Sequence, residues 1–177
     1  ILAPAHLAER LDGLLGQPGF SSGIFDIEPL ADGLVRDVGE LRLEAHRVTH
    51  TDDSYAFRIS AGGAAAAESA AGGAAAADGP GLVYSGDCGR ADDLRPLLHP
   101  GDCLLSEVSF GLDPVPAGAQ HISAADVAGV ARDGAAGRIL LTHLMSGRDR
   151  AAIVAAVARL SGGIPTCLVD PGDTFEL

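Results

Sequence analysis

Short apolar segments alternate with helical segments from Gly81 to the end of the chain, and this alternation constrains the fold more than any other feature. Strands are predicted at 81–85, 103–110 and 138–144, with short closing strands at 166–169 and 174–177. Helices are predicted at 92–99, 123–134 and 149–160. Strands that alternate with helices predict a layered α/β architecture with the helices outside. Strands this apolar are typical of sheets covered on both faces.

The first part of the chain is predicted to hold one helix, one strand and one hairpin. Residues 5–15 place leucines on one face and are followed by Gly16, a candidate C-cap. Alternating apolar and polar side chains predict a strand at 24–30 and a hairpin of strands 41–48 and 55–59. The turn of that hairpin begins at Thr49 and His50.

A low-complexity tract separates the two parts. The heptapeptide AGGAAAA occurs at 61–67 and again at 71–77. Small side chains bury little surface and glycine raises the entropy cost of ordering, so 61–79 is predicted to be a flexible loop. The whole chain, residues 1–177, is otherwise predicted to be a single domain.

Charge and cysteine content argue against several classes of protein. The formal net charge is −12, whereas a protein that binds nucleic-acid phosphates presents a basic face. No apolar run approaches the roughly 18 residues of a membrane span. Three cysteines without a Cys-x-x-Cys pair favour a reducing compartment, hence the cytoplasm, and leave open a signal peptide before Ile1.

Four side chains that can bind metal stand where predicted strands end or a helix begins. They are His50, Asp87, His121 and His143. Ligand sites in open α/β sheets gather at the C-terminal ends of strands, so these side chains are expected to converge. Imidazole and carboxylate are zinc ligands. Each residue alone also fits a plainer role in packing or in an Asx-turn, and only the joint pattern favours a metal site.

These segments resemble the metallo-β-lactamase superfamily, and within it the ribonuclease Z-like branch. The stretch LVYSGDCG is similar to the family's strand and Gly-Asp-Thr-Gly loop, and RILLTHL is similar to its later strand ending in a histidine. The resemblance implies a partial αββα sandwich with mixed sheets and outer helices. It also implies two zinc ions, or other divalent metals, held in part by His50, Asp87 and His143, with Asp87 bridging the pair.

The same resemblance assigns two further residues. CLLSEVSF is similar to a family strand with an internal glutamate, which makes Glu107 a residue that orients a ligand. HISAADVAGVA is similar to a family segment whose histidine donates a proton or contacts the phosphate, which makes His121 catalytic together with Asp87. The implied activity is hydrolysis of a small ester or phosphodiester by a metal-activated water. Relatives of this kind are often homodimers.

The chain departs from the family in two places. Cys88 stands where the family has threonine, and the motif His-x-His-x-Asp-His is absent. We expect that the chain begins after that motif, and the alternative is a degenerate relative that lost it. With so few ligands, the isolated chain is predicted to be weakly active or inactive.

Two other functions stay open at this stage. The first is transfer-RNA 3′-end processing, which ranks lower because the tract at 61–79 contains no basic residue to bind phosphates. The second is a metal-free, non-catalytic relative. A serine hydrolase has little support, because the chain contains no Gly-x-Ser-x-Gly motif.

Overall fold

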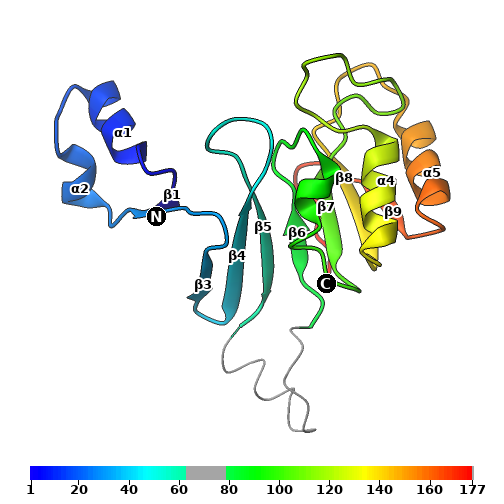
Figure 1. Cartoon of the computed structure of the whole chain (residues 1–177), viewed down its shortest axis with the longest axis horizontal. Helices are drawn as coiled ribbons and strands as arrows, with labels where there is room; N and C mark the ends of the chain where they lie inside the picture. Colours follow the sequence, from blue (N-terminus) through cyan, green and yellow to red (C-terminus); the bar gives the residue numbers. More distant parts are fainter. Residues whose placement is uncertain (63–78, 177) are drawn as a thin grey trace, which may run out of the picture.

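A seven-stranded mixed sheet forms the centre of the molecule in the computed structural model, which describes residues 1–62 and 79–176 (Figure 1). Its strands follow one another in chain order: β3 (Val35–Val38), β4 (Leu41–Arg47), β5 (Tyr55–Ala61), β6 (Leu82–Tyr84), β7 (Cys103–Glu107), β8 (Arg138–Thr142) and β9 (Thr166–Leu168). Strands β3 to β6 pair antiparallel, and β6 to β9 pair parallel. The predicted hairpin is confirmed, with Ala45 opposite Phe57.

The parallel half is built from strands joined by short helices. The connections are η1 (Ala91–Leu94), α4 (Ala124–Asp133) and α5 (Arg150–Leu160). Helix α4 begins at a capping box, in which the Ser123 hydroxyl accepts from the Asp126 backbone and the Asp126 carboxylate accepts from the Ser123 backbone. The α/β architecture predicted from the sequence is therefore confirmed in this half.

The core lies between one face of the sheet and the helices that join its parallel strands. Val83, Leu104 and Ile139 stand side by side on three neighbouring strands and are fully buried. Val127 of α4 and Val157 of α5 pack into the same cluster. Burial of this apolar surface is the main force that holds the helical layer on the sheet.

The opposite face of the sheet is less covered, which differs from the expectation of cover on both faces. Phe57, Tyr84 and Leu105 form a row across β5, β6 and β7. Tyr84 is 40% exposed, and Phe57 and Leu105 are half-buried. The apolar strand composition is correct, but these three residues do not belong to the core cluster of the described residues.

A buried ion pair joins the two halves of the sheet. The Arg58 Nε of β5 donates to the Asp102 carboxylate, which precedes β7, at 2.9 Å, and both side chains are fully buried. Asp102 also accepts from the backbone N–H of Gly81 at 2.7 Å and of His99 at 2.9 Å. Burial acts to raise the pKa of Asp102, but these hydrogen bonds outweigh it and hold the pKa below its ordinary value.

The N-terminal segment differs from its prediction. Helix α1 (Leu7–Leu15) ends at Gly16 in the left-handed conformation, as expected. Its leucine face is not buried, however, and Leu14 is 83% exposed. Residues 24–30 do not form the predicted strand. Helix α2 (Phe20–Ile24) ends at the first of them, and only β2 (Glu28–Pro29) pairs, with β1 (Leu2–Ala3). Figure 1 shows α1 and α2 set apart from the sheet, beyond the β3 edge.

Three smaller predictions are settled or left untested. Residues 92–99 form the 3₁₀ turn η1 and further turns, because Pro96 and Pro100 interrupt any longer helix. Residues 174–176 form no strand. The predicted loop at 61–79 falls largely on 63–78, outside the described residues. Among the helices of the described ranges, none is long and apolar enough to span a bilayer.

Candidate metal centre

The parallel strands bring the predicted ligands to one edge of the sheet. Asp87 follows β6, Glu107 is the last residue of β7, and His143 follows β8. Parallel strands end on the same side, so these three side chains meet there. His50 reaches the same place from the β4–β5 turn, and His121 from the loop before α4.

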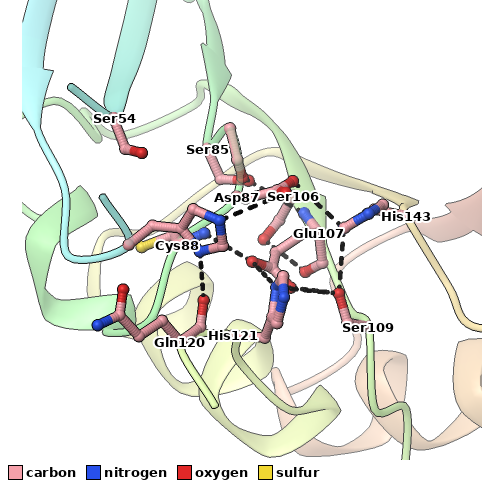
Figure 2. A network of polar contacts seen from close by, with 12 residues as sticks. Ser54, Ser85, Asp87, Cys88, Ser106, Glu107, Ser109, Gln120, His121 and His143 are labelled. Atoms are coloured by element: carbon pink, nitrogen blue, oxygen red, sulfur yellow. Dashed lines mark hydrogen bonds and ion pairs between the residues drawn. The ribbon is translucent and has the colours of Figure 1, made fainter. Parts of the chain in front are cut away.

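The distances show that the four predicted residues form one cluster. His143 Nδ1 lies 3.2 Å from Asp87 Oδ1, and His50 Nε2 lies 3.8 Å from Asp87 Oδ2. The ring of His121 lies between the other two imidazoles, with centroids 5.0 Å from His50 and 5.5 Å from His143. Figure 2 shows Asp87, His121 and His143 turned toward one another. The expected convergence is therefore present.

His50 is held by its Nδ1 atom, which leaves Nε2 facing the centre. Nδ1 lies 2.8 Å from the carbonyl oxygen of Gln120. A carbonyl oxygen only accepts, so Nδ1 carries the hydrogen and Nε2 of the neutral ring has a free lone pair. The preceding residue is also fixed, because the Thr49 N–H donates to Asp93 Oδ2 at 2.8 Å. This is the usual way in which a metal-binding histidine is oriented.

Glu107 is the buried anchor of the centre. Its side chain is 1% exposed and accepts from the backbone N–H of Cys88 at 2.6 Å. It also accepts from Ser109 Oγ at 2.6 Å and from His121 Nδ1 at 2.9 Å. Glu107 thus ties the Asp87 loop and the His121 loop to the end of β7.

Ser109 is a member of the centre that the sequence analysis missed. Its hydroxyl donates to Glu107, so its oxygen accepts from His143 Nδ1, which lies 3.1 Å away. His121 Nδ1 lies 3.3 Å from the same oxygen (Figure 2). The only signal in the sequence is its place two residues beyond Glu107, which continues the strand alternation.

His143 has an unusual backbone conformation. Its φ angle is +52°, in the left-handed region that residues other than glycine rarely adopt. Such strain costs roughly 1–3 kcal/mol and persists only where surrounding contacts impose it. Here it turns the side chain of a residue at a strand end toward Asp87.

Cys88 is a buried thiol next to the cluster. Burial raises the pKa of Cys88 to about 11, and the thiol therefore stays protonated at neutral pH. Its Sγ donates to the carbonyl oxygen of Arg90 at 3.1 Å. The departure from the family's threonine thus leaves a hydrogen-bond donor in place, in a poorly reactive form.

Gly89 lies where three segments of the centre meet. Its N–H donates to the carbonyl oxygen of Thr49. A Cβ atom at this position would lie 2.9 Å from that oxygen and 3.0 Å from the Cα of Gln120. Only glycine therefore allows the Asp87 loop to approach both the His50 turn and the His121 loop.

The donor set fits a cation of the zinc type. One ligand atom each from Asp87, His121 and His143 lies within 4.8 Å of the others. Two donors that share a tetrahedral zinc ion at about 2.0–2.2 Å are about 3.3–3.6 Å apart. The widest pair in this set would therefore have to close by up to about 1.5 Å to share one ion.

Comparison with known proteins supports the fold. No family model matches the chain. An uncharacterized protein of Mycobacterium leprae is 29% identical over 157 residues, which cover 88% of this chain and 49% of that protein. A second uncharacterized protein, from Mycobacterium tuberculosis, is 28% identical over 88% of this chain. The chain thus spans about half the length of these curated relatives.

Solved structures with the same architecture define the class. The metallo-beta-lactamase fold protein YhfI from Bacillus subtilis has a TM-score of 0.70 at 20% identity, over 85% of this chain and 56% of that one. Zn²⁺-bound PqqB from Methylobacterium extorquens has a TM-score of 0.67 at 14% identity, over 99% and 64%. The short form of human tRNase Z has 0.56 at 19%, over 82% and 60%. The chain therefore has a metallo-β-lactamase-type α/β fold, in a mixed sheet with outer helices.

Proposed function

We propose that this chain carries part of the active site of a metal-dependent hydrolase that acts on a small ester or phosphodiester. The observation behind the proposal is the convergence of Asp87, His121 and His143 from three separate loops to within 4.8 Å. The neighbours in fold include metallo-hydrolases, and PqqB binds Zn²⁺.

We assign the metal ligands as His50, Asp87 and His143, and zinc as the metal. The Gln120 carbonyl holds Nδ1 of His50 and leaves its Nε2 available, and Nδ1 of His143 lies 3.2 Å from Asp87 Oδ1. Asp87 stands between them and has two oxygens, so it suits a bridging position between two ions. When bound, such ions supply a Lewis acid and an activated water at neutral pH.

We assign His121 as the proton donor to the leaving oxygen. Its Nδ1 donates to the buried Glu107 carboxylate, which fixes the orientation of the ring. Nε2 then holds the proton that the leaving oxygen receives. Glu107 acts through His121 and is a positioning residue.

A small substrate is favoured over RNA. The net charge of −12 opposes contact with a polyphosphate backbone. The acidic excess instead suits a site whose cations neutralise a single ester or phosphodiester group.

The test combines zinc binding with hydrolysis. Zinc should bind to the chain with an affinity that Asp87→Asn lowers by at least about 100-fold. The control is Asp37→Asn, at an exposed position on β3. Slow hydrolysis of bis(4-nitrophenyl) phosphate or 4-nitrophenyl acetate should require zinc and Asp87. Failure to bind zinc, or hydrolysis that proceeds equally well in Asp87→Asn, would contradict the proposal.

A further inference from the structure

A cavity of about 480 Å³ opens beside the metal centre, with His121 in its wall. Residues of η1, the loop before α4 and one face of α4 form its other sides. We call it the α4 groove. Small-molecule sites commonly measure about 300–1,000 Å³, so the groove is large enough for an organic group.

The orientation of His121 connects the groove to the chemistry of the centre. One side of the ring faces Glu107 and Ser109 through Nδ1, and among the described residues nothing accepts from or donates to Nε2. A donor delivers its proton only to an atom within hydrogen-bond reach. The leaving portion of a substrate would therefore extend from the metal centre, past His121, into the α4 groove.

Most of the charged groups around the groove have hydrogen-bond partners on this chain. Asp126 is held in the capping box of α4. Arg95 donates to Asp92 at 2.8 Å and to Asp133 at 3.0 Å, which satisfies all three groups. One guanidinium against three carboxylates leaves this part of the rim with a net negative charge, so binding of an anionic group depends on Arg90.

Arg90 is the exception within the described part of the groove. Its side chain is 66% exposed, and its nearest carboxylate, Asp93, lies 4.0 Å away, at the limit of an ion pair. Asp93 Oδ2 is also used by the N–H of Thr49. Arg90 is thus the cation best placed to bind an anionic group at the mouth of the groove.

The α4 side of the groove is small and apolar. Gly129 and Val130 line it, and a Cβ at Gly129 would meet nothing within 4 Å. The space above Gly129 is therefore open, and a flat or aliphatic body can lie against the helix without displacing a side chain.

We propose that the α4 groove binds the leaving portion of the substrate, and that this portion is a small organic group with an anionic substituent bound by Arg90. The proposal rests on the proposed hydrolase function, because the role of His121 fixes which part of the substrate enters the groove. It adds a substrate class, an anionic leaving group, which the metal centre alone does not specify.

The test measures binding without metal, so that it does not depend on catalysis. The ¹⁵N-labelled chain in EDTA is titrated with phenyl phosphate, and benzyl alcohol serves as a neutral probe of similar size. Phenyl phosphate should shift the backbone amide signals of Gly89, Gly129 and Val130. Arg90→Gln should weaken its binding about tenfold, since a hydrogen bond to a charged group contributes about that much.

Two further variants sharpen the result. Gly129→Leu, which fills the groove, should abolish the amide shifts at Gly89. Arg159→Gln, an exposed arginine on α5 outside the groove, should bind phenyl phosphate as the unmodified chain does. Circular dichroism establishes that each variant is folded.

Three outcomes would overturn the proposal: equal binding by Arg90→Gln, equal binding of benzyl alcohol, or shifts confined to the histidine cluster. The two proposals fail separately. Binding of phenyl phosphate in the α4 groove without zinc binding or hydrolysis would support the groove proposal and contradict the hydrolase function. The reverse result is zinc-dependent hydrolysis in which Arg90→Gln leaves the KM for an ester with an anionic leaving group unchanged. It would support the hydrolase function and contradict the groove proposal.

Discussion

The contacts of the histidine rings bear on whether His121 is a proton donor or a metal ligand. Its ring is close enough to Asp87 and His143 to share a cation with them. Its Nδ1 is bound to the fully buried Glu107 carboxylate, whereas Nδ1 of His50 contacts a carbonyl, and Nδ1 of His143 contacts the Ser109 hydroxyl and, at 3.2 Å, Asp87. A carboxylate, a carbonyl and a hydroxyl can each orient a metal-binding histidine, so the two roles of His121 are separated by its effect on zinc affinity.

The first prediction therefore separates the two roles by zinc affinity. His143→Gln should weaken zinc binding at least about 100-fold, and His121→Gln should change it less than about threefold. The measurement is a calorimetric or competitive zinc titration. His46→Gln is the control, since His46 pairs with Asp32 outside the cluster. An equal loss of affinity in His121→Gln and His143→Gln would make His121 a ligand.

The sequence predicts the candidate site residues better than it predicts the groups that hold them in place. His50, Asp87 and His143 stand at turns or strand ends, which the apolar pattern locates within one or two residues. Ser109 and the Gln120 carbonyl could not be found in this way. Their contacts arise from loop conformations that bring together positions up to 70 residues apart.

Loops, and not regular elements, set the shape of the centre. Gly89 belongs to no helix or strand, yet it fixes the distance between the His50 turn and the His121 loop. Its role depends on missing volume, because the close atoms belong to backbone and cannot rotate away.

The second prediction concerns this close approach. Gly89→Ala should separate the two loops, lower the free energy of unfolding by about 1–3 kcal/mol and weaken zinc binding about tenfold. Urea unfolding and zinc titration measure the two effects. Gly129→Ala is the matched control: its added methyl meets no atom, and alanine in a helix stabilises by up to about 1 kcal/mol. Unchanged zinc affinity in Gly89→Ala would show that the loops do not need this contact.

Helices and strands were predicted correctly where the apolar periodicity and the turn or capping residues indicated the same element. The hairpin at 41–47 and 55–61 and the capped helix α4 were readable from local pattern. The strand at 24–30 was not, because only two of its residues find a partner strand. Alternation indicates which residues suit a sheet, but pairing decides whether a strand forms.

Across the whole molecule, the ion pair of Arg58 and Asp102 ties the antiparallel half of the sheet to the parallel half. The pKa of Asp102 is lowered in the folded state because hydrogen bonds to the carboxylate outweigh its burial. A lowered pKa means that the folded state favours the charged form. The contribution to stability is therefore complete above the ordinary value of 3.8 and is lost as pH falls below it toward the folded-state pKa.

The third prediction follows from that sign. Asp102→Asn should lower the free energy of unfolding at pH 7 by about 3–5 kcal/mol, because Arg58 would lose its fully buried anionic partner. The unmodified chain should lose stability as the pH falls from about 4 toward 2, and the variant should lose less over that range. Asp37→Asn, exposed on β3, should behave as the unmodified chain does. If the free energy of unfolding changes equally with pH in all three proteins, this prediction is wrong.

The second face of the sheet is the largest difference between expected and observed packing. Strand composition predicts cover on both sides, yet Phe57, Tyr84 and Leu105 lie in a partly exposed row. Sequence pattern records how apolar a strand is, and it does not record which surface meets it. The row is thus an apolar patch with access to water, a feature uncommon on monomeric soluble proteins when it is large.

The last prediction measures that patch directly. The chain should enhance the fluorescence of the dye 8-anilinonaphthalene-1-sulfonate, since this dye binds exposed apolar surface. The double variant Phe57→Gln, Tyr84→Gln should lower the signal by more than about half and lower the free energy of unfolding by about 2–4 kcal/mol, because these side chains are partly exposed. Leu160→Gln, 38% exposed on α5, is the control and should leave the dye signal nearly unchanged. If the dye signal is absent, or if the double variant unfolds, the row is covered and the face is part of a closed core.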